Sequence, residues 1–321
     1  MSVLVYTENW DGQFKKSSFE LVSYAAGIAG MLETSLTVVS IGEVDDDELK
    51  KLGDYGADKI LKVEDEHLKW LDNKVYVDVL ARVAGLENAK VIVLSHNNTG
   101  KAVASGLSVR LKAAAGPGVI SLPVSTDPFI VTKKVFSGKA FGRVILKTDV
   151  KILTLSQNSF EAVLKENKSE IVPYEIDVPE PKTIVKDVSK QSGKILLTDA
   201  EIVVSGGRGM KSQDNWGIIE ELAGLMGAAT ACSRPVSDEG WRPHDEHTGQ
   251  TGKIISPNLY IAAGISGSIQ HMAGVSSSRC IVAINTDPDA PVFEYADYGI
   301  VGDALKVLPD LTEAVKKIKN R

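Results

Sequence analysis

Cysteine is scarce in this sequence, and long apolar runs are missing. Cys232 and Cys280 are the two cysteines among 321 residues, too few for a disulfide framework or a thiolate metal cage. No apolar run approaches the roughly 20 residues that a membrane-spanning helix needs. Residues 1–8 lead straight into a candidate strand, without the charged and apolar regions of a targeting peptide. We expect a soluble, cytoplasmic protein of a reducing compartment, not inserted in a membrane and without a bound metal.

The sequence also lacks an excess of positive charge. Lysine and arginine number 36 against 42 aspartates and glutamates, which gives a formal net charge of -6. Proteins that bind nucleic acid through phosphate contacts usually carry a basic surface, so we expect no nucleic-acid partner. With 43% hydrophobic and 24% charged residues the composition is globular. At about 100–200 residues per domain, the length predicts two domains.

The first half of the chain alternates apolar strands with helical segments. Residues 3–6, 36–41 and 90–94 are short apolar runs, typical of buried parallel strands. Between them, residues 18–32 and 99–113 place small and apolar side chains at helical spacing. The alternation predicts a mostly parallel sheet with helices on both faces.

After this alternating region, predicted strands follow one another without helices between them. Residues 129–136, 140–147 and 151–155 each have the pattern of a strand, and Ser137-Gly138 between the first two is typical of a hairpin turn. We therefore expect an antiparallel edge on a mixed sheet.

A stretch with two prolines, residues 174–190, divides the chain. Its charges alternate with isolated apolar residues, as in a linker. We predict an N-terminal domain of residues 1–190 and a C-terminal domain of residues 191–321. The expected fold is α/β, with two doubly wound domains. The first is built on a mixed, mostly parallel sheet and the second on a Rossmann-like parallel sheet.

Glycine is concentrated in the second domain, where 12 of the 28 glycines lie between positions 206 and 274. A predicted strand at 202–204 runs into the turn SGGRG and then into a helix expected from about residue 212. A helix N-terminus after a glycine turn favours an anion, and a guanidinium such as that of Arg208 can bind phosphate oxygens with two hydrogen bonds. The turn lacks the last glycine and the following acidic residue of a dinucleotide fingerprint, so a plain connecting turn is the alternative.

Further segments of this domain present polar groups at predicted strand ends or helix starts. They are Ser233-Arg234, residues 248–252, residues 266–268 with Gln270 and His271, Asn285, and Asp303. Each has a plainer alternative: a surface ion pair for Arg234, a structural histidine for His271 and a helix cap for Asp303.

No catalytic constellation can be assembled from the sequence. The Gly-x-Ser-x-Gly elbow does not occur, no paired carboxylates stand out, and His244 and His247 have no third ligand nearby for zinc. The second domain is equipped to hold a large phosphorylated cofactor, and we expect no catalytic residue in it.

Taken together, these segments resemble the alpha subunit of electron-transfer flavoprotein. The similarity runs nearly without gaps from about residue 201 to 316, while the first domain resembles the family more loosely. The residues that carry it are SGGRG at 205–209, ACSR at 231–234, GQTGK at 249–253, ISGSIQH at 265–271, VAIN at 282–285 and ADYGIV at 296–301.

The resemblance implies a heterodimer of alpha and beta subunits that holds one FAD mainly on the C-terminal domain of alpha. It implies an electron carrier without turnover of its own. Electrons would come from flavin dehydrogenases, such as the acyl-CoA dehydrogenases of fatty-acid β-oxidation, and pass to a membrane quinone oxidoreductase or another acceptor. The first domain is the expected contact surface for beta.

Three alternatives stay open. Some members of the family bifurcate electrons with a second flavin in beta. A dehydrogenase that uses a nicotinamide dinucleotide is weakened by the missing acidic residue. A nucleotide-binding module without redox chemistry is the third.

The resemblance also implies which residues contact FAD. Arg208, Ser233 and residues 266–271 would contact the cofactor, with the pyrophosphate at the helix N-terminus. Gln250 and Thr251 would lie along the isoalloxazine, with Thr251 near N5. Arg234 would sit over the ring and His271 near the pyrimidine carbonyl, where they would stabilise a negatively charged reduced flavin. The full expected set is Arg208, Ser233, Arg234, Thr248, Gly249, Gln250, Thr251, Ser266, Gly267, Ser268, Ile269, Gln270, His271 and, toward the adenosine, Asn285, Asp303 and Ala304.

Overall fold

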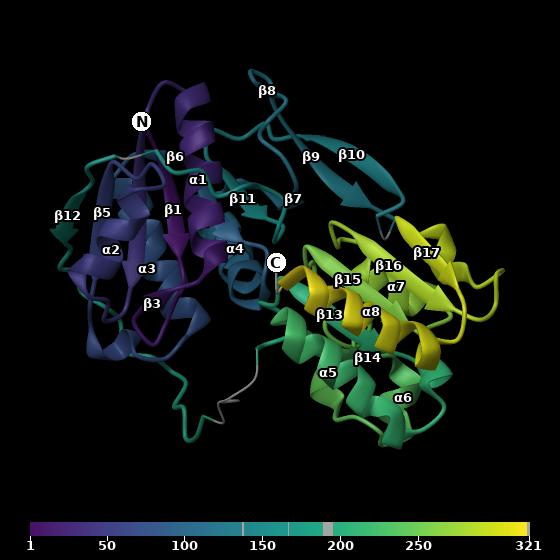
Figure 1. The fold of residues 1–321 in the computed structure, drawn as a ribbon. Helices are drawn as coiled ribbons and strands as arrows, with labels where there is room; N and C mark the ends of the chain where they lie inside the picture. Colours follow the sequence, from purple (N-terminus) through teal and green to yellow (C-terminus); the bar gives the residue numbers. More distant parts are fainter. Residues whose placement is uncertain (137, 166, 189–194, 320–321) are drawn as a thin grey trace. The chain divides into compact units, whose positions relative to one another are not determined.

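The computed structural model describes residues 1–136, 138–165, 167–188 and 195–319. The chain divides into two compact units between residues 188 and 189 (Figure 1). Each unit is built around its own β-sheet and is described by itself.

The sheet of the first unit is mixed and mostly parallel. Its strands run in the order β10 (Ala140–Ile145), β9 (Phe129–Val135), β7 (Ala114–Val119), β11 (Lys151–Leu155), β6 (Ala89–Ser95), β1 (Ser2–Thr7), β4 (Ser35–Ile41), β5 (Lys59–Val63) and β12 (Glu170–Pro173). Every neighbouring pair from β7 to β12 is parallel, whereas β9 is antiparallel to both β7 and β10. Two short elements add to it: β8 (Ser125–Thr126) pairs with β9, and β2 (Asn9–Trp10) forms a hairpin with β3 (Gln13–Phe14).

Helices cover both faces of this sheet. One core contains buried residues of α1 (Lys16–Met31) and α2 (Asp46–Gly53), and the other contains those of α3 (Asn73–Leu86) and α4 (Asn98–Leu111). A short helical turn, η1 (Glu66–Leu68), precedes α3. The apolar strands are buried on both sides, as the absence of alternation in their sequences indicates. The predicted doubly wound arrangement is confirmed.

The predicted antiparallel edge is also confirmed, by the β9–β10 pair. Strand β9 stops at Val135, one residue before the expected end, because Phe136 has a φ of 53°. Residue 137 of the predicted Ser137-Gly138 turn lies outside the described residues. On β10, the exposed Phe141, Arg143 and Ile145 alternate with less exposed residues, so the outer face of this strand carries two large apolar side chains on either side of an arginine.

The described part of the expected linker, residues 174–188, holds no helix or strand, and residues 189–190 lie outside the described part. Its first residues are packed rather than solvated, which the sequence did not indicate. Val178 is buried in the core under α3, and Arg82 donates a hydrogen bond to the carbonyl of Asp177 at 2.9 Å.

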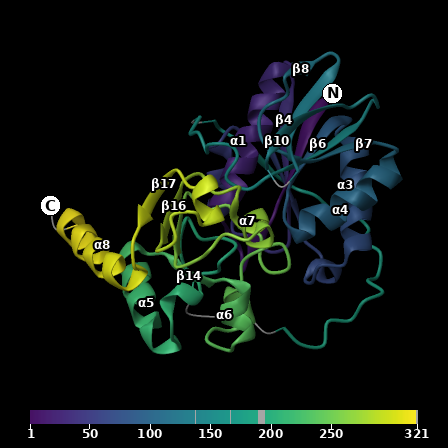
Figure 2. The ribbon, with the colours of Figure 1, turned by 90° about the vertical axis from the view of Figure 1, so that its right-hand side faces the viewer.

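The second unit holds an all-parallel sheet of five strands. Their order is β14 (Ala229–Cys232), β13 (Ile202–Gly206), β15 (Leu259–Ala263), β16 (Ile281–Asn285) and β17 (Tyr298–Val301). Buried residues of α5 (Gly217–Met226) and α8 (Ala304–Lys319) belong to one core, and those of α7 (Ile269–Val275) to the other. Figure 2 shows α5 and α8 together on one side of these strands and α7 on the other. The predicted Rossmann-like parallel sheet is confirmed.

Short helical turns and one short helix complete this unit. They are η2 (Arg208–Met210), η3 (Gln213–Trp216), α6 (Arg234–Asp238), η4 (His244–Glu246) and η5 (Pro291–Glu294). At the outer edge all four residues of β17 are exposed. Among the residues that the structure describes, no helix is long and apolar enough to cross a membrane.

Strand order locates the place where this sheet can bind a ligand. The chain passes from β13 outward to β14 and then returns to β15 on the other side of β13. In open α/β sheets, ligands bind outside the carboxyl ends of the strands at such a reversal. The carboxyl ends of β13 and β15 therefore mark the expected site.

Two helix glycines give a test of the first unit's packing. A Cβ at Gly100, in the first turn of α4, would lie 1.8 Å from the carbonyl oxygen of Ser95, whereas a Cβ at Gly85 of α3 would meet nothing within 4 Å. We expect Gly100→Ala to destabilise the chain by about 1–3 kcal/mol or more, because a backbone atom has to move. Gly85→Ala is the control and stabilises by about 0.4–1 kcal/mol.

Urea unfolding followed by circular dichroism measures both variants. Equal midpoints for the two would contradict the close approach of α4 to the end of β6.

Candidate cofactor site

The parallel sheet of the second unit gathers most of the predicted residues at one edge. Because all its strands point the same way, the segments that follow them emerge together. The predicted residues at these strand ends are Arg208 after β13, Ser233 and Arg234 after β14, residues 266–271 after β15, Asn285 at the end of β16, and Asp303 with Ala304 after β17.

Glycines hold the loops after β13 and β15 in direct backbone contact. The N–H of Gly207 donates to the carbonyl of Ala263 at 2.9 Å, and that of Gly209 donates to the carbonyl of Gly264 at 3.0 Å. A Cβ at Gly207 would lie 2.2 Å from the Gly264 oxygen, and one at Gly209 would lie 2.5 Å from the Gly264 Cα. Only glycine fits here, so the dense glycines of SGGRG serve this loop contact.

The helix expected from about residue 212 to Met226 is present, but its first turn is not α-helical. The chain first forms η2 and η3, and α5 begins only at Gly217. Lys211 adopts a φ of 67° between the two turns, and the Ser212 side chain caps η3 by accepting from the N–H of Asp214. Arg208 lies in η2, is exposed, and has no ion-pair partner among the described residues. Its guanidinium is therefore available to an anion.

Ser233 and Arg234 open the short helix α6. Ser233 is buried and its N–H donates to the carbonyl of Gly206 at 3.0 Å, which places it beside the end of β13. Arg234 is exposed, and its Nε donates to Asp238 at 3.3 Å. The surface ion pair weighed for this arginine is thus present, at one nitrogen of the guanidinium. The Arg234 charge also contributes to the lowered pKa of His247, after burial of that ring.

The loop that contains residues 248–251 is brought to the same edge by backbone hydrogen bonds. The N–H of Thr248 donates to the carbonyl of Cys232 at 3.0 Å, and that of Gln250 donates to the carbonyl of Gln270 at 2.7 Å. Gly249, with a φ of 144°, lies against α7, because a Cβ at Gly274 would be 2.4 Å from the Gly249 Cα. Thr248 is fully buried, and Gln250 and Thr251 are exposed at the tip.

The segment before α7 exposes several polar groups. Ser266, Ser268 and Gln270 are exposed, as is Ile269, and the Ser268 hydroxyl caps α7 by accepting from the N–H of His271 at 3.4 Å. Gly267 has a φ of 86° and lies against the backbone of Val292. This segment and the 248–251 loop therefore offer hydroxyls and amides side by side.

His271 is the buried member of this set, with 5% of its surface exposed. Its Nε2 lies 2.8 Å from the hydroxyl of Tyr260 on β15, and its Nδ1 is buried without a partner among the described residues. Burial, and then the nearby His247, lowers the pKa of His271 to about 4, so its ring is neutral near pH 7. Sequence reasoning missed Tyr260, although a tyrosine inside the apolar strand LYIAA needs a polar partner.

Asn285 and Asp303 already have partners within the chain. Asn285 donates to the carbonyl of Ile265 at 2.9 Å and accepts from the N–H of Asp287 at 3.0 Å. Asp303 accepts from the N–H of Leu305 at 3.1 Å and pairs with Lys211 at 2.8 Å, which lowers the pKa of its carboxyl. The helix cap weighed for Asp303 is thus observed, and the adenosine contact stays a prediction, as does that of the buried Ala304.

Other reactive groups of the unit serve the fold. Cys232 is fully buried, and burial raises the pKa of its thiol to about 12, so it is not a nucleophile near neutral pH. Ser237 shares a hydrogen bond of 2.9 Å with His244. In the described ranges, no three His, Cys, Asp or Glu side chains gather closely enough to hold a metal ion.

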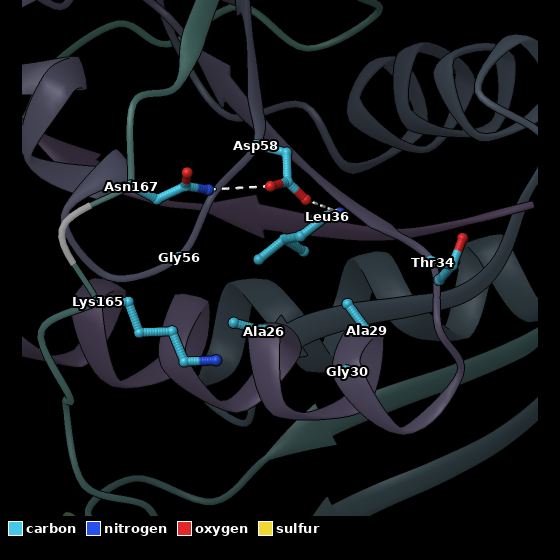
Figure 3. A pocket seen from close by; sticks show the side chains of 9 residues that line it. All are labelled: Ala26, Ala29, Gly30, Thr34, Leu36, Gly56, Asp58, Lys165 and Asn167. Carbon is cyan, nitrogen blue, oxygen red and sulfur yellow. Dashed lines mark hydrogen bonds between the residues drawn. The ribbon is translucent and has the colours of Figure 1, made fainter.

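The first unit has a pocket of about 240 Å³ at the amino ends of its parallel strands (Figure 3). It is lined by Ala26, Ala29, Gly30, Thr34, Leu36, Gly56, Asp58, Lys165 and Asn167. Asp58 accepts from the side chain of Asn167 at 2.9 Å and from the N–H of Leu36 at 2.8 Å. The carboxylate and amide of this pocket bind each other, and Lys165 adds an ammonium group to the lining.

Comparisons with known proteins match both units. Residues 3–179 match a family model described as the electron transfer flavoprotein domain, and residues 196–276 match one described as the electron transfer flavoprotein FAD-binding domain. The electron transfer flavoprotein subunit alpha of Bacillus subtilis is 37% identical over 319 residues, covering 98% of each chain. That of Syntrophomonas wolfei is 34% identical with the same coverage. Protein FixB of Azorhizobium caulinodans is 33% identical and covers 98% of this chain and 88% of its own.

The low pKa of His271 predicts an acid-dependent loss of stability. Its pKa of about 4 lies below the usual 6.5, so between these values the unfolded chain binds a proton that the folded chain does not. The neutral His271 ring therefore contributes to the free energy of unfolding. This contribution is complete above pH 6.5 and is lost as the pH falls toward 4. Between pH 7 and 4.5, we expect the wild type to lose about 2–3 kcal/mol more than His271→Gln, which cannot take up that proton.

Urea unfolding at the two pH values measures this difference. The same acid loss in both proteins would show that His271 titrates normally in the folded chain.

Proposed function

Because the chain belongs to the alpha-subunit family of the electron-transfer flavoproteins and has their FAD-binding domain, we propose that it holds one FAD on residues 191–321 and carries single electrons between partner proteins. In this proposal it is the alpha half of an alpha–beta heterodimer and turns over no substrate of its own. The observation that supports it best is the set of exposed polar groups at the carboxyl ends of one parallel sheet, around the buried Nδ1 of His271.

The residues present fit such a cofactor. FAD is long and carries a pyrophosphate, so it needs anion-binding groups at one point and amide or hydroxyl groups along its length. Arg208, which pairs with no described residue, has its guanidinium for an anion, and Ser233 with residues 266–270 adds hydroxyl and backbone donors. Gln250 and Thr251 stand exposed at a loop tip beside this segment. Asn285, Asp303 and Ala304 are the proposed contacts of the adenosine end.

Bound FAD supplies the electron chemistry, and the chain's own groups set its environment. Among the described residues the Arg234 guanidinium pairs with Asp238 alone, at 3.3 Å, and so keeps most of its donors for a negatively charged group. His271 is neutral and buried, so it can offer an N–H without adding a charge. Thr251 would supply a hydroxyl to the ring. A positive charge and donors near a flavin favour its reduced, negatively charged forms.

The proposed donors are flavin dehydrogenases, such as acyl-CoA dehydrogenases, and the proposed acceptor is a quinone oxidoreductase. Family membership is the support for both. We also propose the cytoplasm as the compartment, because both cysteines are free thiols and one is fully buried.

Co-expression with a candidate beta subunit tests the proposal. The purified complex is reduced stepwise while its visible spectrum is recorded. A yellow complex with one FAD that bleaches in two one-electron stages supports the carrier. A colourless complex that binds a nicotinamide dinucleotide instead would overturn it.

The Arg234 charge gives a prediction for the bound cofactor. We expect Arg234→Ala to lower the potential of the first reduction step by on the order of 60 mV, a tenfold change in a one-electron equilibrium. Asp238→Ala is the matched control, because it removes the arginine's partner and keeps its positive charge. It leaves the potential unchanged or higher.

Potentiometric titration of the FAD-loaded heterodimer measures both variants. An unchanged potential in Arg234→Ala would place this guanidinium away from the ring.

The first unit is the proposed contact surface for beta, and its strand β10 exposes two large apolar side chains. Phe141 is 69% exposed and Ile145 is 50% exposed, on the same face of β10. We expect Phe141→Glu to reduce co-purification of beta at least tenfold, since a buried unpaired carboxylate costs several kcal/mol. Val109→Glu on α4 is the control, because Val109 is 81% exposed elsewhere in this unit. Equal loss of beta in both variants, or in neither, argues against this surface.

A further inference from the structure

A buried polar cluster lies on the inner side of the candidate site. Tyr260 of β15 is fully buried, and its hydroxyl lies 2.8 Å from Nε2 of His271. Ser205 of β13 and Thr248, both fully buried, lie close to the same hydroxyl and act to lower its pKa, although the Ser205 Oγ completes no hydrogen bond with a described group. Burial outweighs them and raises the pKa of Tyr260 well above its usual value. The tyrosine therefore keeps its proton and has it to donate.

The protonation state of His271 limits how this contact can be made. Since burial lowers the pKa of His271 to about 4, the ring is neutral near pH 7 and carries one N–H. Either Nε2 accepts from Tyr260 and Nδ1 holds the proton, or Nε2 holds it and Nδ1 is a bare acceptor.

The hydroxyl of Tyr260 favours the first arrangement. It keeps its proton and lies at hydrogen-bond distance from Nε2, so Nε2 accepts and the single ring proton is left on Nδ1, which completes no hydrogen bond with any described group. A buried donor without a partner is costly and marks a place where a ligand is expected. The loop of the exposed Gln250 meets the backbone of α7 at Gln270 and His271, so we expect an acceptor that reaches Nδ1 to come from the candidate site.

We propose that Tyr260 is a positioning residue: its hydroxyl donates to Nε2 of His271 and holds the ring as the neutral Nδ1–H tautomer, which presents that N–H to a carbonyl oxygen of the bound flavin. The flavin contact rests on the proposed function, whereas the tautomer is a property of this chain alone. Tyr260 touches no cofactor in this scheme and acts through His271.

The first test reads the tautomer directly. Proton–nitrogen correlation spectra of the full chain, labelled with 15N in its histidines, distinguish a protonated from a bare ring nitrogen. His271→Gln identifies the signals of His271 by their loss. We expect Nδ1–H in the wild type and a loss of this fixed tautomer in Tyr260→Phe. A wild-type ring protonated at Nε2, or an unchanged ring in Tyr260→Phe, would overturn the proposal.

A matched control comes from the first unit. Tyr24 of α1 is also fully buried, and its hydroxyl donates to the carbonyl of Ser121 at 3.1 Å. Tyr24→Phe therefore makes the same chemical change at a buried site in the other unit. It leaves the His271 signals as they are in the wild type, so a general effect of losing a buried hydroxyl is separated from the loss of this one.

The second test reads the effect on the cofactor in the FAD-loaded heterodimer. We expect Tyr260→Phe to bind FAD as the wild type does. We expect its equilibrium constant for one-electron reduction of the bound FAD to fall about threefold to tenfold, and the larger change corresponds to a potential about 59 mV lower. Tyr24→Phe leaves the potential unchanged. Bound FAD with an unaltered potential in Tyr260→Phe would overturn the flavin contact. A wild type that binds no FAD would instead overturn the proposed function, and the spectra of the chain would still decide the tautomer.

Discussion

The contact between two glycine loops is the constraint on which the second unit depends. Gly207 and Gly209 on one loop and Gly264 on the other meet backbone to backbone, at distances that leave no room for a Cβ. This contact lies where the strand order reverses, at the carboxyl ends of β13 and β15. It fixes the start of η2, which carries Arg208, and the start of the segment that leads to His271.

Much of the fold could be predicted from the sequence because its signals are local. Apolar runs separated by helical segments indicate parallel strands, and a proline-containing stretch marks the end of the first unit. The sequence does not indicate that the helix ending at Met226 opens with a 3₁₀ turn, η3, which the Ser212 side chain caps, or that Lys211 before it has a positive φ. The burial of Val178 could not be predicted either, since it packs in the core with residues of α3 that are distant in sequence.

The candidate site likewise has features that the sequence indicates and features that it does not. Arg208, Arg234 and His271 stand out because charged or titratable residues are unusual beside glycines and apolar strands. The sequence could not show that Asp303 binds Lys211 and caps α8, or that Tyr260 reaches His271 across two elements. Such pairings arise from strand register and helix placement. They decide which donors remain available, so the role of each residue follows from its neighbours.

The outer edge of the second sheet has a consequence for the synthesis of this protein. β17 pairs with β16 on one side, and Tyr298, Ile300 and Val301 are all exposed along it. An apolar strand with an open edge is a template for other strands, and self-association of this kind rises steeply with concentration. A cell that produced this chain at high concentration would be expected to lose part of it to aggregates or proteases. The level at which the chain is made is then limited by the exposed edge of its second sheet.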